Sequence, residues 1–351
     1  MSLSSLQITG LRCIAEASLE FTAGLNLVFG VNGSGKTSVL EAAFLAGRGR
    51  SFRTRHTEQL IARDRAQLQL FATTTDPAHR IGFEYRRDES YSARLDGQDV
   101  RSLAELPAAF FAEVIDPEVH RLVEGAPAER RRWLDWGVFH VEQGFLESWL
   151  RFTRSLKQRN AALRQGQDPQ PWDLELAQQG EVVARLRGQW LQTVLPFWQK
   201  TVQRLSGLDV EMHYHQGWAA ERSLAEVLKE SVERDRSRGS TLSGPQRADV
   251  QLRLQGKPAR EVLSRGQQKL VAAAMVLALL QRLRGERQTP PTLLLDDPAA
   301  ELDSARLAAL VELVRELRCQ LIVTALHADL GNFGRPERVF HVERGHVSTV
   351  R

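Results

Sequence analysis

The chain has 351 residues, of which 42% are hydrophobic and 26% charged, so it is long enough for two domains and too apolar for a disordered chain. The formal net charge is +4 and the pI is about 9.3, which weakly favours a polyanionic partner. Two cysteines, Cys13 and Cys319, offer neither a metal-binding spacing nor a disulfide framework, and they favour a reducing cytosol.

Neither a secretory leader nor a membrane span is expected. The first residues lack a basic segment followed by an apolar run. The longest apolar run, residues 270–280, is shorter than the roughly 20 residues that cross a bilayer. We therefore expect a cytoplasmic protein with no membrane partner.

Short strands dominate the first third of the chain. Alternating apolar and polar residues predict strands over residues 3–11, 17–21, 24–30, 67–75, 79–87 and 91–100. A helix is predicted from Lys36 to about Leu45, and Asp96-Gly97 is typical of a hairpin turn.

The middle of the chain is patterned for helices. From about Pro117 to Arg238, Trp and Leu recur at helical spacing with arginines between them. Pro169, Pro171 and Pro196 interrupt this stretch, which predicts a folded arm of several helices rather than one continuous rod.

Strands and helices alternate again in the last third. The pattern predicts strands over residues 250–254, 292–295 and 320–324 and helices over residues 265–284 and 304–318. We therefore predict an α/β head, residues 1–112 with 243–351, interrupted by a helical arm, residues 113–242. The helix near 264–284 is left open as a possible part of the arm.

A phosphate-binding loop follows the third predicted strand and precedes a helix. Residues 30–37 match G-x-x-x-x-G-K-[ST], with ATP contacts expected from Gly30, Val31, Asn32, Gly33, Ser34, Gly35, Lys36, Thr37 and Ser38. Its backbone N–H groups surround phosphate oxygens at a helix N-terminus. Lys36 should reach the β- and γ-phosphates in catalysis, and the Thr37 hydroxyl should bind Mg²⁺.

Two acids end the apolar strand over residues 292–295. Asp296 is expected to hold Mg²⁺ beside the phosphate-binding loop. Asp297 then occupies the place of a catalytic base that orients the attacking water. The alternative is that Asp297, which precedes Pro298, is only an acid at the end of a strand.

The stretch LSRGQQ, residues 263–268, resembles the LSGGQ signature of ABC ATPases. Ser264, Arg265, Gly266 and Gln267 begin a long helix, where an anion can bind. In ABC ATPases this tip completes the site of the other subunit, so two copies should close around ATP. The alternative is that Ser264 is an ordinary helix cap.

Four arginines follow the helix of the phosphate-binding loop with no acid between them: Arg48, Arg50, Arg53 and Arg55. Such a cluster can neutralise nucleic-acid phosphates without regard to sequence. The alternatives are a solvated surface, or arginines that serve ATP and the dimer interface.

The chain as a whole resembles the RecF family, bacterial DNA replication and repair ATPases related to SMC heads. The stretches that carry the resemblance are GVNGSGKTSVLEA, GRGRSFRT, DPEVHRLVEGAPAERRRWLDW, LSGPQRADV, LSRGQQKL and LLLDDPAAELD. The resemblance implies an ABC/SMC-type head with a helical arm, an ATP-dependent homodimer and weak DNA-dependent ATP hydrolysis. It also implies binding to duplex DNA and single-strand/duplex junctions, and work with RecO and RecR in placing RecA at gaps.

Several positions depart from the usual ABC pattern. Glu113 is the nearest candidate for the usual Gln before the arm, and Asp297 replaces the usual Glu. Ala325 stands where a switch histidine is expected, with His327 two residues on. These departures predict slow hydrolysis. The stretch Glu301-Leu302-Asp303 resembles the loop that crosses the dimer interface, with Asp303 as the interface residue; the alternative is a helix N-terminus with acidic residues.

Three other classes compete with a DNA-repair ATPase. The ATPase subunit of an ABC transporter would share the motifs, but the 228 residues between Lys36 and Ser264 exceed its usual insertion. A small-molecule kinase has no use for LSRGQ, and an SMC protein with long coiled coils needs a longer chain.

Overall fold

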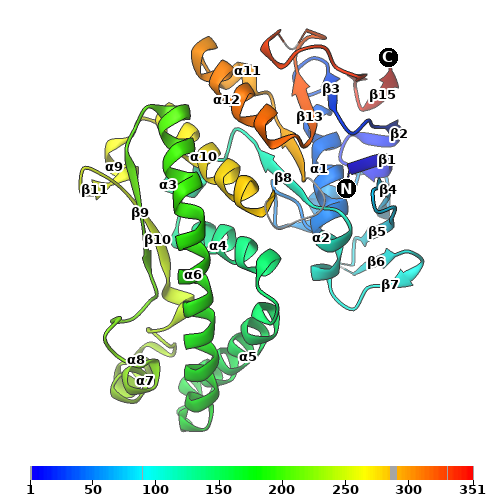
Figure 1. The fold of residues 1–351 in the computed structure, drawn as a ribbon. Helices are drawn as coiled ribbons and strands as arrows, with labels where there is room; N and C mark the ends of the chain where they lie inside the picture. The colour runs from blue at the N-terminus through cyan, green and yellow to red at the C-terminus, as the bar shows by residue number, and fades with distance from the viewer. Residues whose placement is uncertain (1, 89, 285–290, 330, 351) are drawn as a thin grey trace. The chain divides into compact units, whose positions relative to one another are not determined.

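The computed structural model describes residues 2–88, 90–284, 291–329 and 331–350 (Figure 1). Contacts divide the chain into two compact units. We call Met1–Val119 with Arg287–Arg351 the head and His120–Glu286 the arm. The arm thus interrupts the head, although its bounds differ from those predicted.

The arm begins after Val119 rather than at residue 113. Ala112–Ile115 forms a strand, β8, that pairs in parallel with Thr292–Leu295, β12, and therefore belongs to the head. Sequence patterning misassigned this edge strand because it has only four residues.

The arm ends at Glu286 rather than at residue 242. Asp249–Leu254, β10, pairs with Val210–His215, β9, and Arg265–Arg284, α10, packs along Asp173–Ser206, α6. These contacts place the signature helix in the arm, which is the assignment that the sequence left open.

One sheet of the head is antiparallel. Its six strands lie in the order β2-β1-β4-β5-β6-β7. They are β1 (Ser2–Leu11), β2 (Ile14–Glu20), β4 (Gln67–Thr75), β5 (Arg80–Arg86), β6 (Tyr91–Leu95) and β7 (Gln98–Asp99). Burial alternates along β4, as expected for a sheet with one solvated face. The predicted turn at Asp96-Gly97 joins β6 to β7, and both residues have positive φ.

The second sheet of the head is mostly parallel. Its order is β15-β14-β3-β13-β12-β8, and only the pairing of β15 with β14 is antiparallel. The strands not yet bounded are β3 (Leu25–Phe29), β13 (Gln320–Ala325), β14 (Arg338–Glu343) and β15 (His346–Thr349). The carboxyl ends of parallel strands meet at one edge, where α/β proteins bind ligands.

Helix α1 (Lys36–Arg48) lies in the core of the head, where every residue except Thr37 is buried. It contacts strands of both sheets, including β1, β4, β8 and β13. Leu40, Phe83 and Leu294 belong to one continuous apolar cluster, which holds the phosphate-binding loop rigidly at the start of the helix. The other head helices are η1 (Thr57–Leu60), η2 (Leu103–Glu105), α2 (Leu106–Ala109), α11 (Pro298–Glu301), α12 (Ser304–Leu317) and η5 (Gly331–Phe333).

The arm is built on α6, with a small antiparallel sheet in the order β11-β10-β9. Its other elements are α3 (Arg121–Glu124), α4 (Pro127–Val141), α5 (Phe145–Arg164), η3 (Gln170–Trp172), α7 (Leu224–Glu230), α8 (Val232–Arg238), η4 (Pro245–Arg247), β11 (Lys257–Pro258) and α9 (Ala259–Val262). No helix among the described residues is long and apolar enough to cross a bilayer.

The prolines act differently from the prediction. Pro169 and Pro171 lie in the break between α5 and α6, as expected. Pro196 lies inside the 34-residue α6, so the predicted break there is wrong. Val194 and Trp198 beside it are fully buried, and this packing offsets the hydrogen bond that proline removes.

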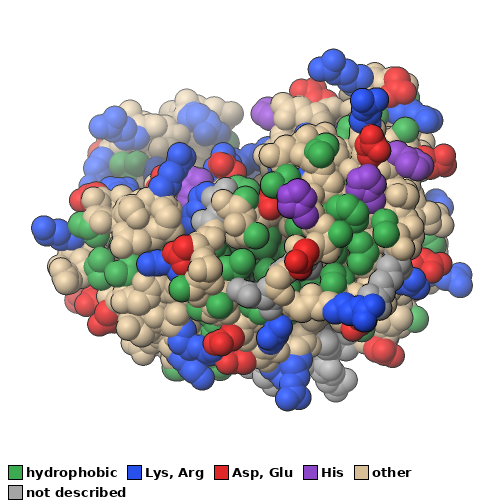
Figure 2. Space-filling model, turned by 90° about the horizontal axis from the view of Figure 1, so that it is seen from above, with side chains coloured by type: hydrophobic (Ala, Val, Ile, Leu, Met, Phe, Trp, Pro, Cys, Tyr) green, Lys and Arg blue, Asp and Glu red, His purple; other side chains and the backbone are tan. Residues whose placement is uncertain are grey.

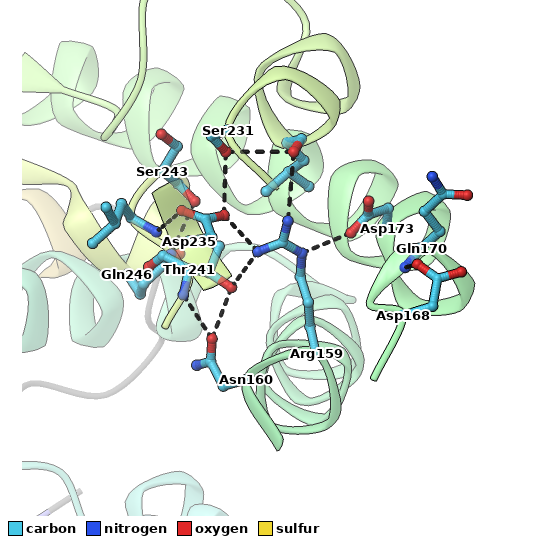
Figure 3. Close-up of polar contacts among 12 residues, drawn as sticks. Arg159, Asn160, Asp168, Gln170, Asp173, Ser231, Asp235, Thr241, Ser243 and Gln246 are labelled. Atoms are coloured by element: carbon cyan, nitrogen blue, oxygen red, sulfur yellow. Dashed lines mark hydrogen bonds and ion pairs between the residues drawn. The ribbon is translucent and has the colours of Figure 1, made fainter. Parts of the chain in front are cut away.

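A buried ion-pair network fastens α5 to the rest of the arm (Figure 3). The Arg159 side chain is 0% exposed, and it donates to Asp173 Oδ1 at 2.7 Å, Asp235 Oδ2 at 2.7 Å and Thr241 Oγ1 at 2.8 Å. Asn160 accepts from the Thr241 N–H at 2.7 Å. The network joins α5 to the start of α6, to α8 and to the segment that follows α8.

Candidate nucleotide-binding site

The phosphate-binding loop runs from the end of β3 to the start of α1. Gly30 and Gly35 have φ angles of 156° and 118°. A Cβ on Gly30 would lie 2.2 Å from the Val342 carbonyl oxygen, and one on Gly35 would lie 2.9 Å from Cys13 Sγ. Only glycine fits at both positions, because the loop has no room for a side chain there.

Lys36 is held against the loop. Its Nζ donates to the carbonyl oxygens of Gly30 at 2.7 Å and Val31 at 3.1 Å, and the residue is 7% exposed. No acid lies in the first turn of α1, so the positive end of the helix is not neutralised there. The ammonium group of Lys36 and the N-terminus of α1 therefore both favour binding of a phosphate group.

Asp296 meets Thr37 at the carboxyl edge of the parallel sheet. The Thr37 hydroxyl lies 3.1 Å from Asp296 Oδ1 and 3.0 Å from Oδ2. Thr324, at the corresponding position of β13, donates its hydroxyl to Asp296 Oδ1 at 2.7 Å. The Asp297 N–H donates to Thr324 Oγ1 at 2.8 Å. Sequence reasoning missed Thr324, whose only signal was its place at the end of a neighbouring strand.

Asp297 has a left-handed backbone, with φ 49° and ψ 51°, and it precedes α11. Asp tolerates this region better than most residues, but the conformation still carries strain. Strained backbone recurs at active sites. The structure therefore places the two predicted acids together, with Asp296 directed at Thr37 and the Asp297 backbone fixed by Thr324.

The residues present fit ATP and Mg²⁺. Ser34 Oγ is buried and has no hydrogen-bond partner among the described residues, so the loop keeps a polar group for a phosphate oxygen. Thr37 and Asp296 supply a hydroxyl and a carboxylate, the hard oxygen ligands that Mg²⁺ prefers.

Glu113 and Arg48 form a buried ion pair with each other. Burial lowers the pKa of Arg48 to about 9, against the opposing effect of Glu113. Glu113 pairs with Leu293 across the sheet, three residues before Asp296. Arg48, predicted as one of the DNA-binding arginines, is therefore buried against Glu113, and Glu113, the candidate for the usual Gln before the arm, is engaged by Arg48.

The remaining arginines of the cluster, Arg50, Arg53 and Arg55, are exposed. Arg53 Nη1 lies 3.7 Å from Glu41 Oε2. Glu41, on α1, is 0% exposed and also accepts from Arg12 and from the Ser51 hydroxyl. No motif in the sequence points to Glu41, which ties the arginine-rich segment to the nucleotide-binding helix.

The signature residues belong to the arm. Ser264 Oγ accepts from the Gln267 N–H at 3.3 Å, and Gln267 Oε1 accepts from the Ser264 N–H at 2.9 Å, a reciprocal cap at the start of α10. Ser264, Arg265 and Gly266 are exposed. Apart from its chain neighbours and its own helix backbone, no atom of the described residues lies within 4 Å of where a Gly266 Cβ would be, so this helix terminus is open to a ligand.

Asp303 and His327 are the last predicted candidates. Asp303 is the N-cap of α12, where its carboxylate accepts from the Arg306 N–H at 2.9 Å and pairs with the Arg306 guanidinium at 3.0 Å. This geometry matches the simpler reading of a helix cap. His327 is exposed, two residues beyond the end of β13. Over the face seen in Figure 2, basic side chains are interspersed with acidic ones.

These features define the class of the protein. A sheet with parallel central strands, a phosphate-binding loop between β3 and α1, and a paired hydroxyl and carboxylate are the parts of a P-loop ATPase head of the ABC/SMC type.

The family follows from comparison with known proteins. The family model for the RecF/RecN/SMC N-terminal domain matches residues 2–348. The DNA replication and repair protein RecF of Pseudomonas aeruginosa (strain LESB58) is 39% identical over 360 residues, covering 99% of this chain and 98% of that protein. RecF of Stutzerimonas stutzeri (strain A1501) is 38% identical over 362 residues, covering 100% and 98%. The chain belongs to the RecF family.

Solved structures share the fold. The recombination mediator protein RecF-ATP in the RecFOR pathway has a TM-score of 0.89 and 24% identity, covering 99% of this chain and 97% of that chain. An Smc head bound to the C-winged helix domain of ScpA has a TM-score of 0.61 and 15% identity, covering 100% and 97%. These likenesses confirm the predicted ABC/SMC-type fold.

Proposed function

We propose that the protein acts in DNA replication and repair as an ATP-gated clamp, in which two copies close around ATP and hold DNA. The observation that carries the proposal is the array of Thr37, Asp296 and Thr324 beside the phosphate-binding loop. The curated relatives, 39% identical over the whole chain, are named DNA replication and repair proteins, which supports this function over that of a transporter subunit.

The loop residues bind and orient the nucleotide. Lys36 exchanges the carbonyl oxygens of Gly30 and Val31 for phosphate oxygens, and the N–H groups at the start of α1 add their partial positive charge. Thr37 and Asp296 would hold Mg²⁺, which neutralises charge that develops on the phosphates.

The signature terminus acts on the second copy. Ser264 and the Gly266 N–H would contact the nucleotide bound to the partner, because an exposed helix N-terminus attracts phosphate. Each site is then incomplete in one copy alone, and ATP becomes the link that holds the dimer. Hydrolysis by Asp297 would end this state slowly, so ATP sets the lifetime of the dimer.

Arg50, Arg53 and Arg55 would contact DNA phosphates, on duplexes and at single-strand/duplex junctions, with little sequence specificity. RecO and RecR are the expected partners in placing RecA at gaps in cytoplasmic DNA.

Mass in solution tests the proposal. The protein should be monomeric alone, dimeric with ATP-Mg²⁺, and bound to duplex DNA as the dimer. Lys36→Met should abolish ATP-driven dimerisation, with the unchanged monomer mass and circular dichroism spectrum as controls. A Lys36→Met variant that still dimerises with ATP would show that the dimer does not depend on this site.

A further inference from the structure

Two stretches typical of the RecF family, residues 127–135 and 242–250, meet in the arm without a role in the nucleotide site. Arg130 on α4 binds both oxygens of Asp249 on β10, at 2.8 and 3.0 Å. Arg187 on α6 binds both oxygens of Asp135 on α4, at 2.6 and 2.9 Å. Each arginine is neutralised by a two-point ion pair.

These two arginines are structural. Arg130 is 5% exposed and donates to the carbonyl oxygen of Gly125 at 2.9 Å, besides its bonds to Asp249. Arg187 is 3% exposed and donates to the Pro245 carbonyl oxygen at 2.8 Å. Their donors are directed into the arm, so neither side chain is available to a ligand.

Arg131 and Arg247 lie beside these pairs without an acid of their own. Arg131 is half-buried, and its one hydrogen bond, among the described residues, is from Nη1 to the Ala248 carbonyl oxygen at 2.7 Å. Arg247, the neighbour of Ala248, is exposed, and its guanidinium has no hydrogen bond or ion pair with the described residues. The pKa of Arg131 is lowered, first by burial and next by Arg187; Asp249 and Asp135 oppose the shift, and Arg247 adds the smallest effect.

The segment that carries Arg247 is fixed in place before any ligand arrives. Arg159 and Asn160 bind Thr241 at its start, as Figure 3 shows, and Gln246 Nε2 donates to the Ser243 carbonyl oxygen at 2.9 Å. The Arg247 N–H donates to the Gly244 carbonyl oxygen at 2.8 Å. Because the backbone is already ordered, binding at Arg247 costs only the conformational entropy of its side chain.

We propose that Arg131 and Arg247 form a contact for the phosphate backbone of nucleic acid on the arm, separate from the arginine cluster of the head. The inference rests on the proposed function, because it takes nucleic acid as the ligand. Arg130, Arg131, Arg187 and Arg247 bring four positive charges to this part of the arm, and Asp135 and Asp249 bring two negative ones, each held by Arg187 or Arg130. Two positive charges remain in excess, which phosphodiester anions would balance.

Nucleic acid suits this surface better than an acidic protein segment. Protein partners usually need an exposed apolar anchor. Among the described residues, none of the large exposed hydrophobic side chains of the arm lies on α4 or η4, which carry Arg131 and Arg247. They are Leu150, Trp172, Leu174, Phe197 and Val262. Backbone phosphates require only positioned cations.

The test measures duplex DNA binding with ATP-Mg²⁺ over a salt series. Arg131→Gln and Arg247→Gln should each flatten the log–log salt dependence by about 0.9, and the double variant by about 1.8. Arg253→Gln is the matched control, since Arg253 is an exposed arginine on β10 whose Nη2 bonds Gln251 Oε1 at 3.1 Å. It should keep the wild-type slope.

Arg247→Gln removes no side-chain hydrogen bond or ion pair with the described residues, so it separates binding from folding. If Arg131→Gln and Arg247→Gln both keep the wild-type salt dependence, the inference is overturned. The proposed function would still stand in that case, provided that the wild-type protein dimerises with ATP and binds DNA. A wild-type protein that dimerises but binds no DNA would overturn both. Loss of binding to a polyglutamate peptide, with unchanged DNA binding, would assign the arginines to an acidic protein and also overturn the inference.

Discussion

Replacing Arg159 with leucine should destabilise the arm strongly. The Arg159 and Asp235 side chains are both 0% exposed and lie 2.7 Å apart. Removing the cation leaves Asp235 buried and uncompensated, which typically costs about 3–5 kcal/mol. For a unit of this size each kcal/mol lowers the melting temperature by about 2–4 °C, so the arm should melt about 6–20 °C lower.

The loss of stability in Arg159→Leu should depend on pH. Burial raises the pKa of Asp173, although Arg159 opposes the shift. A carboxyl with a raised folded pKa destabilises the fold above that pKa, and the cost disappears as the pH falls through it. Without Arg159 the raising effect of burial is unopposed. The difference in stability between Arg159→Leu and wild type should therefore be smaller at pH 5 than at pH 7.

Thermal unfolding followed by calorimetry and circular dichroism measures both effects. Arg159→Lys keeps the charge but not the forked geometry of the guanidinium, so its melting temperature should lie between those of wild type and Arg159→Leu. The double variant Arg159→Leu/Asp235→Leu removes the uncompensated acid and should recover part of the loss. A melting temperature for Arg159→Leu within 2 °C of wild type would refute the reasoning, since ~3 kcal/mol requires a larger shift.

Three further predictions concern DNA and ATP. Arg50→Gln and Arg55→Gln should each flatten the salt dependence of DNA binding by about 0.9, whereas Arg48→Met should lower the melting temperature and leave the slope unchanged. Ser264→Arg should bind ATP as a monomer but fail to dimerise in mass measurements with ATP-Mg²⁺; a variant that cannot bind ATP would place Ser264 in its own site. Asp297→Asn should dimerise with ATP and hydrolyse it more slowly, by less than the roughly 10²–10⁴-fold that a well-placed general base contributes.

Local motifs predicted much of the nucleotide site. The phosphate-binding loop, the acid pair and the signature are each contiguous in sequence, and each follows or precedes an element whose apolar pattern is clear. Parallel strands then bring Asp296 to Thr37, because both lie at the same edge of the sheet.

Local sequence patterns did not predict the contacts between segments that are distant in the chain. Glu41 gives no sign in the sequence that it will bind Arg12, and Thr324 gives none that it will bind Asp296. Arg48 belongs to a run of arginines typical of a solvated surface, yet one more turn of α1 buries it against Glu113. Burial and pairing depend on tertiary packing, which local composition does not encode.

In the proposed mechanism, hydrolysis depends on how far the Asp297 carboxylate reaches. Its backbone is fixed in the left-handed region, and its N–H is bound to Thr324, so only the side chain can adjust. That side chain is one methylene shorter than glutamate, and a general base contributes about 10²–10⁴-fold only within hydrogen-bond reach. Asp297→Glu should therefore raise the ATPase rate and shorten the dimer lifetime, opposite to Asp297→Asn. Asp296→Asn should instead weaken ATP-Mg²⁺ binding itself. If Asp297→Asn keeps the wild-type rate, another group positions the water, and Glu113 could take that role only by leaving its ion pair with Arg48.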